Sequence, residues 1–260
     1  MALKLDLHKA AQGLRLSLEK RGIVTPPQAE LAFVLDVSGS FEDEHAAGIT
    51  NDLLTRLVPW GMVFDPDQKL DCFTFSSGPG AAHYVGEITT ENYQDYVAQK
   101  IIGRVPGWKG GTVYSDILEK ILKHFGWMPE ASPPESTSNG GVWEWFRGLF
   151  ASETSCTLPT PSASRRKKSI GVFVTDGENE DKDRTQEVLA ASQRRGDQTY
   201  FLFIGISNQG GDFPFLREIA DRYSNTGLVI IRDLKEFVAK SDDELNQALI
   251  GEELVTWLKR

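Results

Sequence analysis

Short apolar runs that end in polar residues constrain this chain more than any other feature. The first run, Leu31–Leu35, stops at Asp36, and four later segments repeat the pattern: 70–75, 169–175, 200–206 and 228–231. A run that is apolar at every position is typical of a strand buried on both faces, as in a parallel sheet. The intervening segments space their apolar residues as helices do: 46–58, 91–101, 114–125, 185–195, 215–223 and 243–258. Because strands and helices alternate, the sequence predicts a three-layer, doubly wound α/β fold with a mostly parallel sheet, and 83–88 as an edge strand.

Two segments lie outside this alternation. Residues 1–29 hold an amphipathic helix over 3–20 and the connector Pro26-Pro27. We expect this segment to pack on the main domain, because a helix of this length is marginal alone. Residues 129–168 are rich in Pro, Ser and Thr around the aromatic stretch 142–150. That composition predicts a mobile insertion within a single domain that spans 30–260.

Composition and charge exclude several classes of function. The chain has 28 Lys and Arg against 37 Asp and Glu, a net charge of −9, which argues against nucleic-acid or anionic-membrane binding. Its two cysteines lie far apart without CxxC spacing, so we exclude a disulfide framework and a thiolate zinc site. The first residues contain no apolar run long enough for a signal peptide or a membrane span. We therefore expect a cytoplasmic protein without a transmembrane segment.

Oxygen-bearing side chains follow two of the predicted strands. Asp36, Ser38 and Ser40 come at or just after the end of the first strand, Asp176 follows the strand over 169–175, and Thr112 lies in a Gly-Gly-Thr loop. In doubly wound sheets, ligands bind at the carboxyl ends of the strands where the strand order reverses. A 3-2-1-4-5-6 order would place the first and fourth strands side by side. Five oxygen donors without sulfur or imidazole suit a hard cation.

These motifs resemble those of a known family. Asp-x-Ser-x-Ser, Gly-Gly-Thr and Thr-Asp-Gly, in this order, are similar to the metal-ion-dependent adhesion site (MIDAS) of von Willebrand factor A (vWA) domains, over residues 30–258. Four further segments resemble the TerF-like bacterial subfamily, which is associated with tellurium resistance: 6–22, 64–71, 91–97 and 175–179. Phe41 stands where the family usually has methionine, and the insertion over 129–168 is not part of the family's pattern.

The resemblance implies a Rossmann-like vWA fold that binds Mg²⁺ or Mn²⁺, with Ca²⁺ also compatible. It makes Ser38 and Ser40 direct ligands and Thr112 a direct or water-bridged ligand, whereas Asp36 and Asp176 act largely through water. A carboxylate from an Asp or Glu of a protein partner could take the remaining coordination position. The implied function is a metal-dependent protein-binding module in a bacterial stress or tellurium-resistance system, and not an enzyme.

Other interpretations stay open. Two aspartates beside a metal could support a Mg²⁺-dependent phosphoester hydrolase, although the chain has no P-loop and its three motifs contain no Lys or Arg. The aromatic stretch 142–150 could make the contacts of a structural scaffold, or it could cover the domain's own apolar surface. The Asp-x-Ser-x-Ser hydroxyls could simply cap a helix. The four histidines lack HxxxH or HExxH spacing, so zinc catalysis lacks ligands.

Overall fold

The computed structural model of the chain describes residues 3–128, 167–207 and 210–260. Its six strands form one sheet in the order β3-β2-β1-β4-β5-β6. Every neighbouring pair is parallel except β2 and β3, which are antiparallel. This confirms the predicted α/β, doubly wound, mostly parallel sheet. The strands are β1 (Ala29–Asp36), β2 (Leu70–Phe75), β3 (His83–Ile88), β4 (Lys168–Thr175), β5 (Thr199–Ile206) and β6 (Thr226–Ile231).

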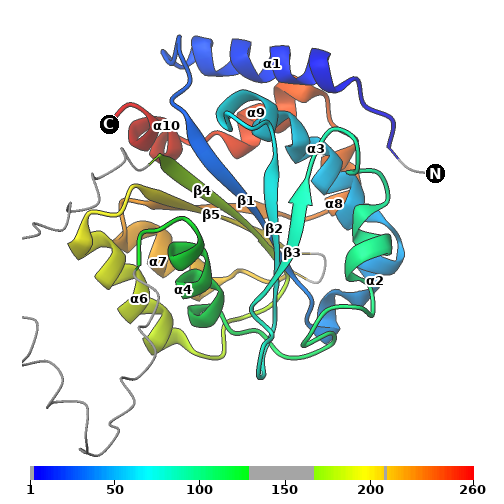
Figure 1. Cartoon of the computed structure of the whole chain (residues 1–260), viewed down its shortest axis with the longest axis vertical. Helices are drawn as coiled ribbons and strands as arrows, with labels where there is room; N and C mark the ends of the chain where they lie inside the picture. Colours follow the sequence, from blue (N-terminus) through cyan, green and yellow to red (C-terminus); the bar gives the residue numbers. More distant parts are fainter. Residues whose placement is uncertain (1–2, 129–166, 208–209) are drawn as a thin grey trace, which may run out of the picture. The chain divides into compact units, whose positions relative to one another are not determined.

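Helices cover both faces of this sheet (Figure 1). One layer contains α1 (Leu7–Lys20), α3 (Ile49–Phe64), α8 (Leu234–Val238), α9 (Asp242–Leu249) and α10 (Glu252–Leu258). The other contains α4 (Ser115–His124), α6 (Lys182–Arg195) and α7 (Pro214–Arg222). Shorter turns of helix complete the connections: η1 (Gly39–Phe41), α2 (Glu42–Ala46) and the π turn η2 (Val97–Ile101).

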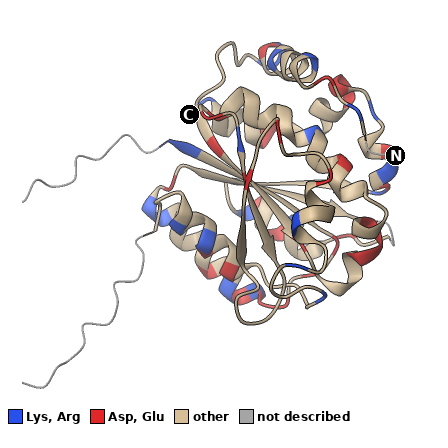
Figure 2. Cartoon of the chain, turned by 45° about the vertical axis from the view of Figure 1, so that its right-hand side comes forward, with Lys and Arg blue, Asp and Glu red and all other residues tan. Residues whose placement is uncertain are grey.

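The position of β1 in the centre of the sheet explains why its residues 31–35 are all apolar. Leu31, Phe33 and Leu35 pack into the core beneath the first layer of helices. Ala32 and Val34 pack into the core beneath the second. All five side chains are fully buried, because successive residues of a strand point to opposite faces. Charged residues lie mainly on helices and loops, and few lie on strands (Figure 2).

Helix α1 contacts α3 and α9. Asp6 caps its start by accepting a hydrogen bond from the Lys9 N–H, and Leu14 and Leu18 are fully buried. These contacts show how the N-terminal helix buries the apolar stripe that its sequence predicts. The proposed insertion over 129–168 lies outside the described residues, apart from Lys167 and Lys168, the first residue of β4. No helix within the described ranges is long and apolar enough to cross a membrane.

Three predicted helices differ from the structure. The helix expected over 91–101 is wrong, because turns fill its first half and only η2 is helical. Asp95 has a left-handed φ of 53°, a conformation that interrupts a helix. The helix expected over 243–258 is two helices, because the backbone is extended at Gly251 between α9 and α10. Helix α3 continues beyond its predicted end, through Pro59 to Phe64.

Helix α3 approaches the start of β2 closely at Gly61, and a substitution there tests this packing. A Cβ added there would lie 2.7 Å from the Lys69 carbonyl oxygen, so we expect Gly61→Ala to destabilise the fold by about 1–3 kcal/mol. Helix propensity alone would favour alanine by about 1 kcal/mol. Gly13→Ala in α1 is the control, because its Cβ would meet only Asp242 Cβ at 3.8 Å. Urea unfolding measures both, and equal stabilisation by the two variants would contradict this packing.

Candidate metal centre

The carboxylate of Asp36 joins the ends of the two central strands. Strands β1 and β4 pair in parallel up to Leu35 and Val174. One residue further on, Thr175 Oγ1 donates a hydrogen bond of 2.6 Å to Asp36 Oδ2, and the Ser38 N–H donates one of 2.8 Å to Asp36 Oδ1. Asp36 has no exposed surface. Its carboxylate therefore fixes the turn after β1 relative to β4.

Three further oxygens continue from this buried carboxylate toward the surface. Ser38 Oγ and Ser40 Oγ lie 3.3 Å apart, and Ser40 Oγ donates to Asp176 Oδ1 over 3.0 Å. Ser38 is buried, Asp176 is half-buried and Ser40 is exposed. The contact between Ser40 and Asp176 joins residues 136 positions apart in the chain. The structure thus brings together four of the five residues that the sequence singles out.

Thr112, the fifth residue, lies against the turn that follows Asp176. A Cβ built on Gly177 would be 2.6 Å from Thr112 Oγ1, so only glycine leaves room for this hydroxyl. The Gly-Gly-Thr loop also reaches the turn after β1, because the Gly39 N–H donates to the Gly110 carbonyl over 3.0 Å. All three motifs therefore meet at the carboxyl ends of β1 and β4. Their roles as metal ligands remain predictions.

The acidic run after Asp176 holds the Thr112 loop in place. The Thr112 N–H donates to Glu180 Oε1 over 3.2 Å, and the Glu180 N–H donates to the Thr112 carbonyl over 2.9 Å. Asp181 accepts from the N–H groups of Tyr114 and Ser115 at the start of α4. Sequence reasoning did not identify these positioning residues. Their signal is the Glu-Asn-Glu-Asp run at 178–181.

His45 contacts the end of β1 through one of its ring nitrogens. Its Nε2 lies 2.9 Å from the Asp36 carbonyl oxygen and its Nδ1 lies 3.1 Å from Thr50 Oγ1. The ring packs between Phe41 and Trp108, at centroid distances of 4.9 and 5.5 Å. Burial lowers the pKa of His45 to about 4, so the ring is neutral at pH 7. Phe41, at the family's usual methionine position, is fully buried.

The electrostatics of the centre fit a hard cation. Burial raises the pKa of Asp36 to about 7 and also raises the pKa of Asp176 above its usual value. Two lysines of the adjoining segments, Lys109 and Lys182, form ion pairs with Glu42 and Glu178. A divalent cation would supply the missing positive charge, and the five donors are all oxygens.

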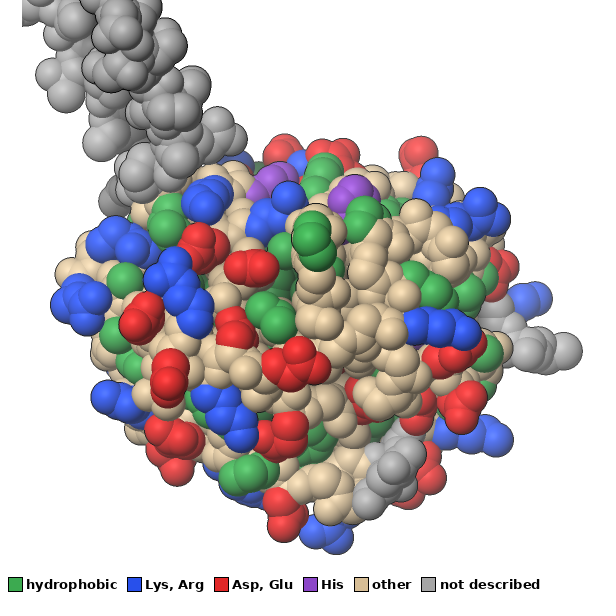
Figure 3. Space-filling view, turned by 90° about the horizontal axis from the view of Figure 1, so that it is seen from below, with side chains coloured by type: hydrophobic (Ala, Val, Ile, Leu, Met, Phe, Trp, Pro, Cys, Tyr) green, Lys and Arg blue, Asp and Glu red, His purple; other side chains and the backbone are tan. Residues whose placement is uncertain are grey.

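Carboxylates alone would not hold an ion at this centre. Within the described ranges, no three His, Cys, Asp or Glu side chains lie together in a way that could bind a metal. Hydroxyl groups would have to complete the ligand set with Asp36 and Asp176. Figure 3 looks onto this end of the sheet and shows acidic side chains around the middle of the face.

Part of the chain matches the model of a known family. The model of the vWA-TerF-like family, described as vWA found in the TerF C terminus, matches residues 28–134. The uncharacterized protein YcbR of Bacillus subtilis (strain 168) is 25% identical over 259 residues, which cover 98% of this chain and 86% of YcbR.

Solved structures show weaker likeness. Proximal thread matrix protein 1 from the mussel byssus has a TM-score of 0.47 and 15% identity, covering 86% of this chain and 48% of that one. Manganese-loaded TRAP protein of Plasmodium vivax has a TM-score of 0.43 and 16% identity, covering 88% of this chain and 74% of that one. The chain thus spans about half the length of the mussel protein.

The raised pKa of Asp36 predicts how the stability of metal-free protein depends on pH. The folded state holds the Asp36 proton up to about pH 7, whereas the unfolded chain loses it near 3.8. The extra free energy of unfolding that the bound proton gives is therefore complete below pH 3.8. It is lost as the pH rises through 7, and the free energy of unfolding decreases by at most about 4 kcal/mol. Urea unfolding in EDTA across this range measures it. Asp36→Asn should flatten this part of the profile, and a variant profile parallel to the wild type would contradict the assignment.

Proposed function

We propose that the chain is a metal-ion-dependent protein-binding module, from the premise that residues 28–134 match the model of the vWA-TerF-like family. The observation that carries the proposal is the hydrogen bond of 3.0 Å from Ser40 Oγ to Asp176 Oδ1. It places a hydroxyl from the first motif and a carboxylate from the third at one point, at the carboxyl ends of adjacent strands. Ligands of doubly wound folds bind at such points.

The donors have distinct roles in this proposal. Ser38 and Ser40 would hold Mg²⁺ or Mn²⁺ directly, and Thr112 directly or through a water. Asp36 and Asp176 would act largely through bound water. Mg²⁺ gives up its water reluctantly, which suits a site of hydroxyl groups and two carboxylates. The ion would supply a Lewis-acidic position, and an Asp or Glu carboxylate of a protein partner would fill it without any bond being broken.

The same contacts favour binding over catalysis. Both carboxylate oxygens of Asp36 accept hydrogen bonds and the residue is fully buried, so it is poorly placed as a nucleophile. Both nitrogens of His45 have partners, and its low pKa makes it a weak base. We therefore propose that the chain is not an enzyme. The phosphoester hydrolase remains the alternative, and turnover of p-nitrophenyl phosphate that depends on Mg²⁺ and is lost in Ser40→Ala would establish it instead.

The biological setting is proposed from the family alone. The description of the matching family names TerF, which supports a role in a bacterial tellurium-resistance or stress system in the cytoplasm. The net charge of −9 supports a protein partner over nucleic acid.

Removal of one exposed hydroxyl tests the metal centre. We expect Ser40→Ala to weaken Mn²⁺ or Mg²⁺ binding at least about tenfold, because it removes a proposed ligand without disturbing the core. Ser224→Ala is the matched control: Ser224 is also exposed, but it lies between α7 and β6 and contacts Gln193 and Arg260. Isothermal titration calorimetry measures both variants. Equal heats for Ser40→Ala, Ser224→Ala and wild type would refute the site.

A second experiment locates the partner-binding surface. We expect capture of partner proteins from a bacterial lysate to be lost in EDTA, to be lost in Ser40→Ala, and to survive deletion of 142–150. Pulldown followed by mass spectrometry measures it. Capture that survives EDTA but not the deletion would instead support the scaffold interpretation, in which the aromatic stretch makes the contacts.

A further inference from the structure

Strand β6 ends the sheet on one side, and its outer edge has no partner strand in the described part of the chain. The Phe201 N–H donates to the Asn225 carbonyl and the Ser207 N–H donates to the Ile231 carbonyl, at 2.9 and 2.7 Å. Successive residues of a strand direct their backbone N–H and C=O groups to opposite sides. The backbone groups of the odd-numbered residues of β6 therefore point toward β5. The backbone groups of Leu228 and Ile230 therefore point outward. Such an edge is a template for another strand.

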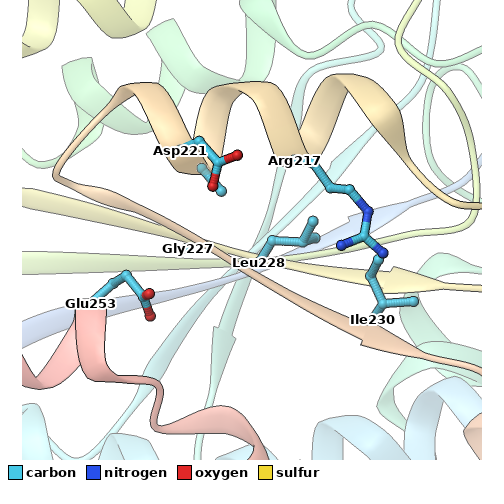
Figure 4. A pocket seen from close by; sticks show the side chains of 7 residues that line it. Arg217, Asp221, Gly227, Leu228, Ile230 and Glu253 are labelled. Carbon is cyan, nitrogen blue, oxygen red and sulfur yellow. The ribbon is translucent and has the colours of Figure 1, made fainter.

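The outer edge of β6 forms the floor of a groove between α7 and α10 (Figure 4). A cavity of about 310 Å³ lies there, lined by Arg217, Ala220, Asp221, Gly227, Leu228, Ile230 and Glu253. A second cavity, of about 400 Å³, shares Arg217 and Ile230 and adds Arg232. Leu228, Val229 and Ile230 are each partly exposed. The groove therefore combines an apolar strand with open backbone groups.

Charges of opposite sign lie at the two ends of this groove. Arg217 and Arg232 line it near Ile230, together with one carboxylate, Asp212. Asp221 and Glu253 lie near Gly227 (Figure 4). All five are exposed, and none forms an ion pair with another described side chain. Within the described residues, the guanidinium of Arg217 donates to the Asp212 carbonyl through Nε. At about 3.3 Å per residue, Gly227 and Ile230 are about 10 Å apart.

We propose that this edge binds a second copy of the chain, with the two β6 strands antiparallel about a two-fold axis at Val229. Leu228 of each copy then faces Ile230 of the other, and each such pair exchanges two N–H···O=C bonds. These are the residues whose backbone groups point outward. The two Val229 residues face each other on the axis. They form a pair of the closely spaced type, whose backbone groups make no hydrogen bonds to each other. The backbone pattern of β6 therefore suits this register.

The charge pattern is the reason to choose a second copy over an unrelated peptide. A two-fold axis at Val229 brings the basic end of each groove, at Arg217, to the acidic end of the other, at Asp221 and Glu253. Isologous interfaces require such self-complementarity. A uniformly basic or acidic peptide would match only one end of the groove. The pairing would join two sheets into one. Because the paired strands are antiparallel, the two candidate metal centres would lie at opposite ends of the strands. The pairing does not depend on the metal.

Sedimentation equilibrium in EDTA, over a range of protein concentrations, tests the proposal. We expect wild type to dimerise, and Arg217→Glu or Asp221→Arg alone to raise the dimer dissociation constant at least about tenfold, because each creates two like-charge contacts. An equimolar mixture of the two variants restores opposite charges at both contacts, so we expect it to dimerise within a few-fold of wild type. Simple misfolding would not give this rescue. A monomeric wild type, or a mixture no better than either variant, would overturn the proposal.

Val229→Lys tests the position of the axis. It places two ammonium groups together across the axis, so we expect a monomer. Val24→Lys is the matched control, because Val24 is 78% exposed and lies in the connector before β1; it should dimerise as wild type does. Circular dichroism shows whether both variants fold. A folded Val229→Lys that still dimerises would place the interface elsewhere. A wild-type dimer that appears only when Mn²⁺ is added would mean association through the metal face instead.

Discussion

The hydrogen bond from Thr175 to Asp36 is the contact on which the candidate site depends. It requires β1 and β4 to be neighbours, which the order β3-β2-β1-β4-β5-β6 provides. A buried carboxylate is costly unless hydrogen bonds satisfy it, and here both oxygens have donors. The turn after β1 is thereby fixed beside the turn after β4. Ser38, Ser40 and Asp176 meet because these two turns meet.

Much of this arrangement could be predicted from the sequence. The apolar runs located the strands, since burial on both faces leaves few polar positions. The polar residues at or just after the first and fourth strands indicated where they meet. The positioning contacts could not be predicted, because they are made to backbone groups. His45 contacts the Asp36 carbonyl nine positions earlier, and Glu180 and Asp181 accept from N–H groups more than 60 positions away. The helix expected over 91–101 failed for a local reason, the left-handed Asp95.

One sheet supplies both features that we connect with function. Its parallel central strands bring polar turns together at their carboxyl ends, which gives the candidate metal centre. Its order leaves β6 at an edge, with backbone groups of Leu228 and Ile230 open in the groove between α7 and α10. The first feature suits a cation and a partner carboxylate. The second suits an identical strand, so recognition and self-association would use separate surfaces.

A crystal structure grown with Mn²⁺ and recorded at the manganese absorption edge tests the central claim most directly. The account predicts one strong anomalous peak at the ends of β1 and β4, bonded to the hydroxyl oxygens of Ser38 and Ser40, with Thr112, Asp36 and Asp176 around it. An anomalous map without a peak there, or with manganese bound only at other carboxylates, would contradict it.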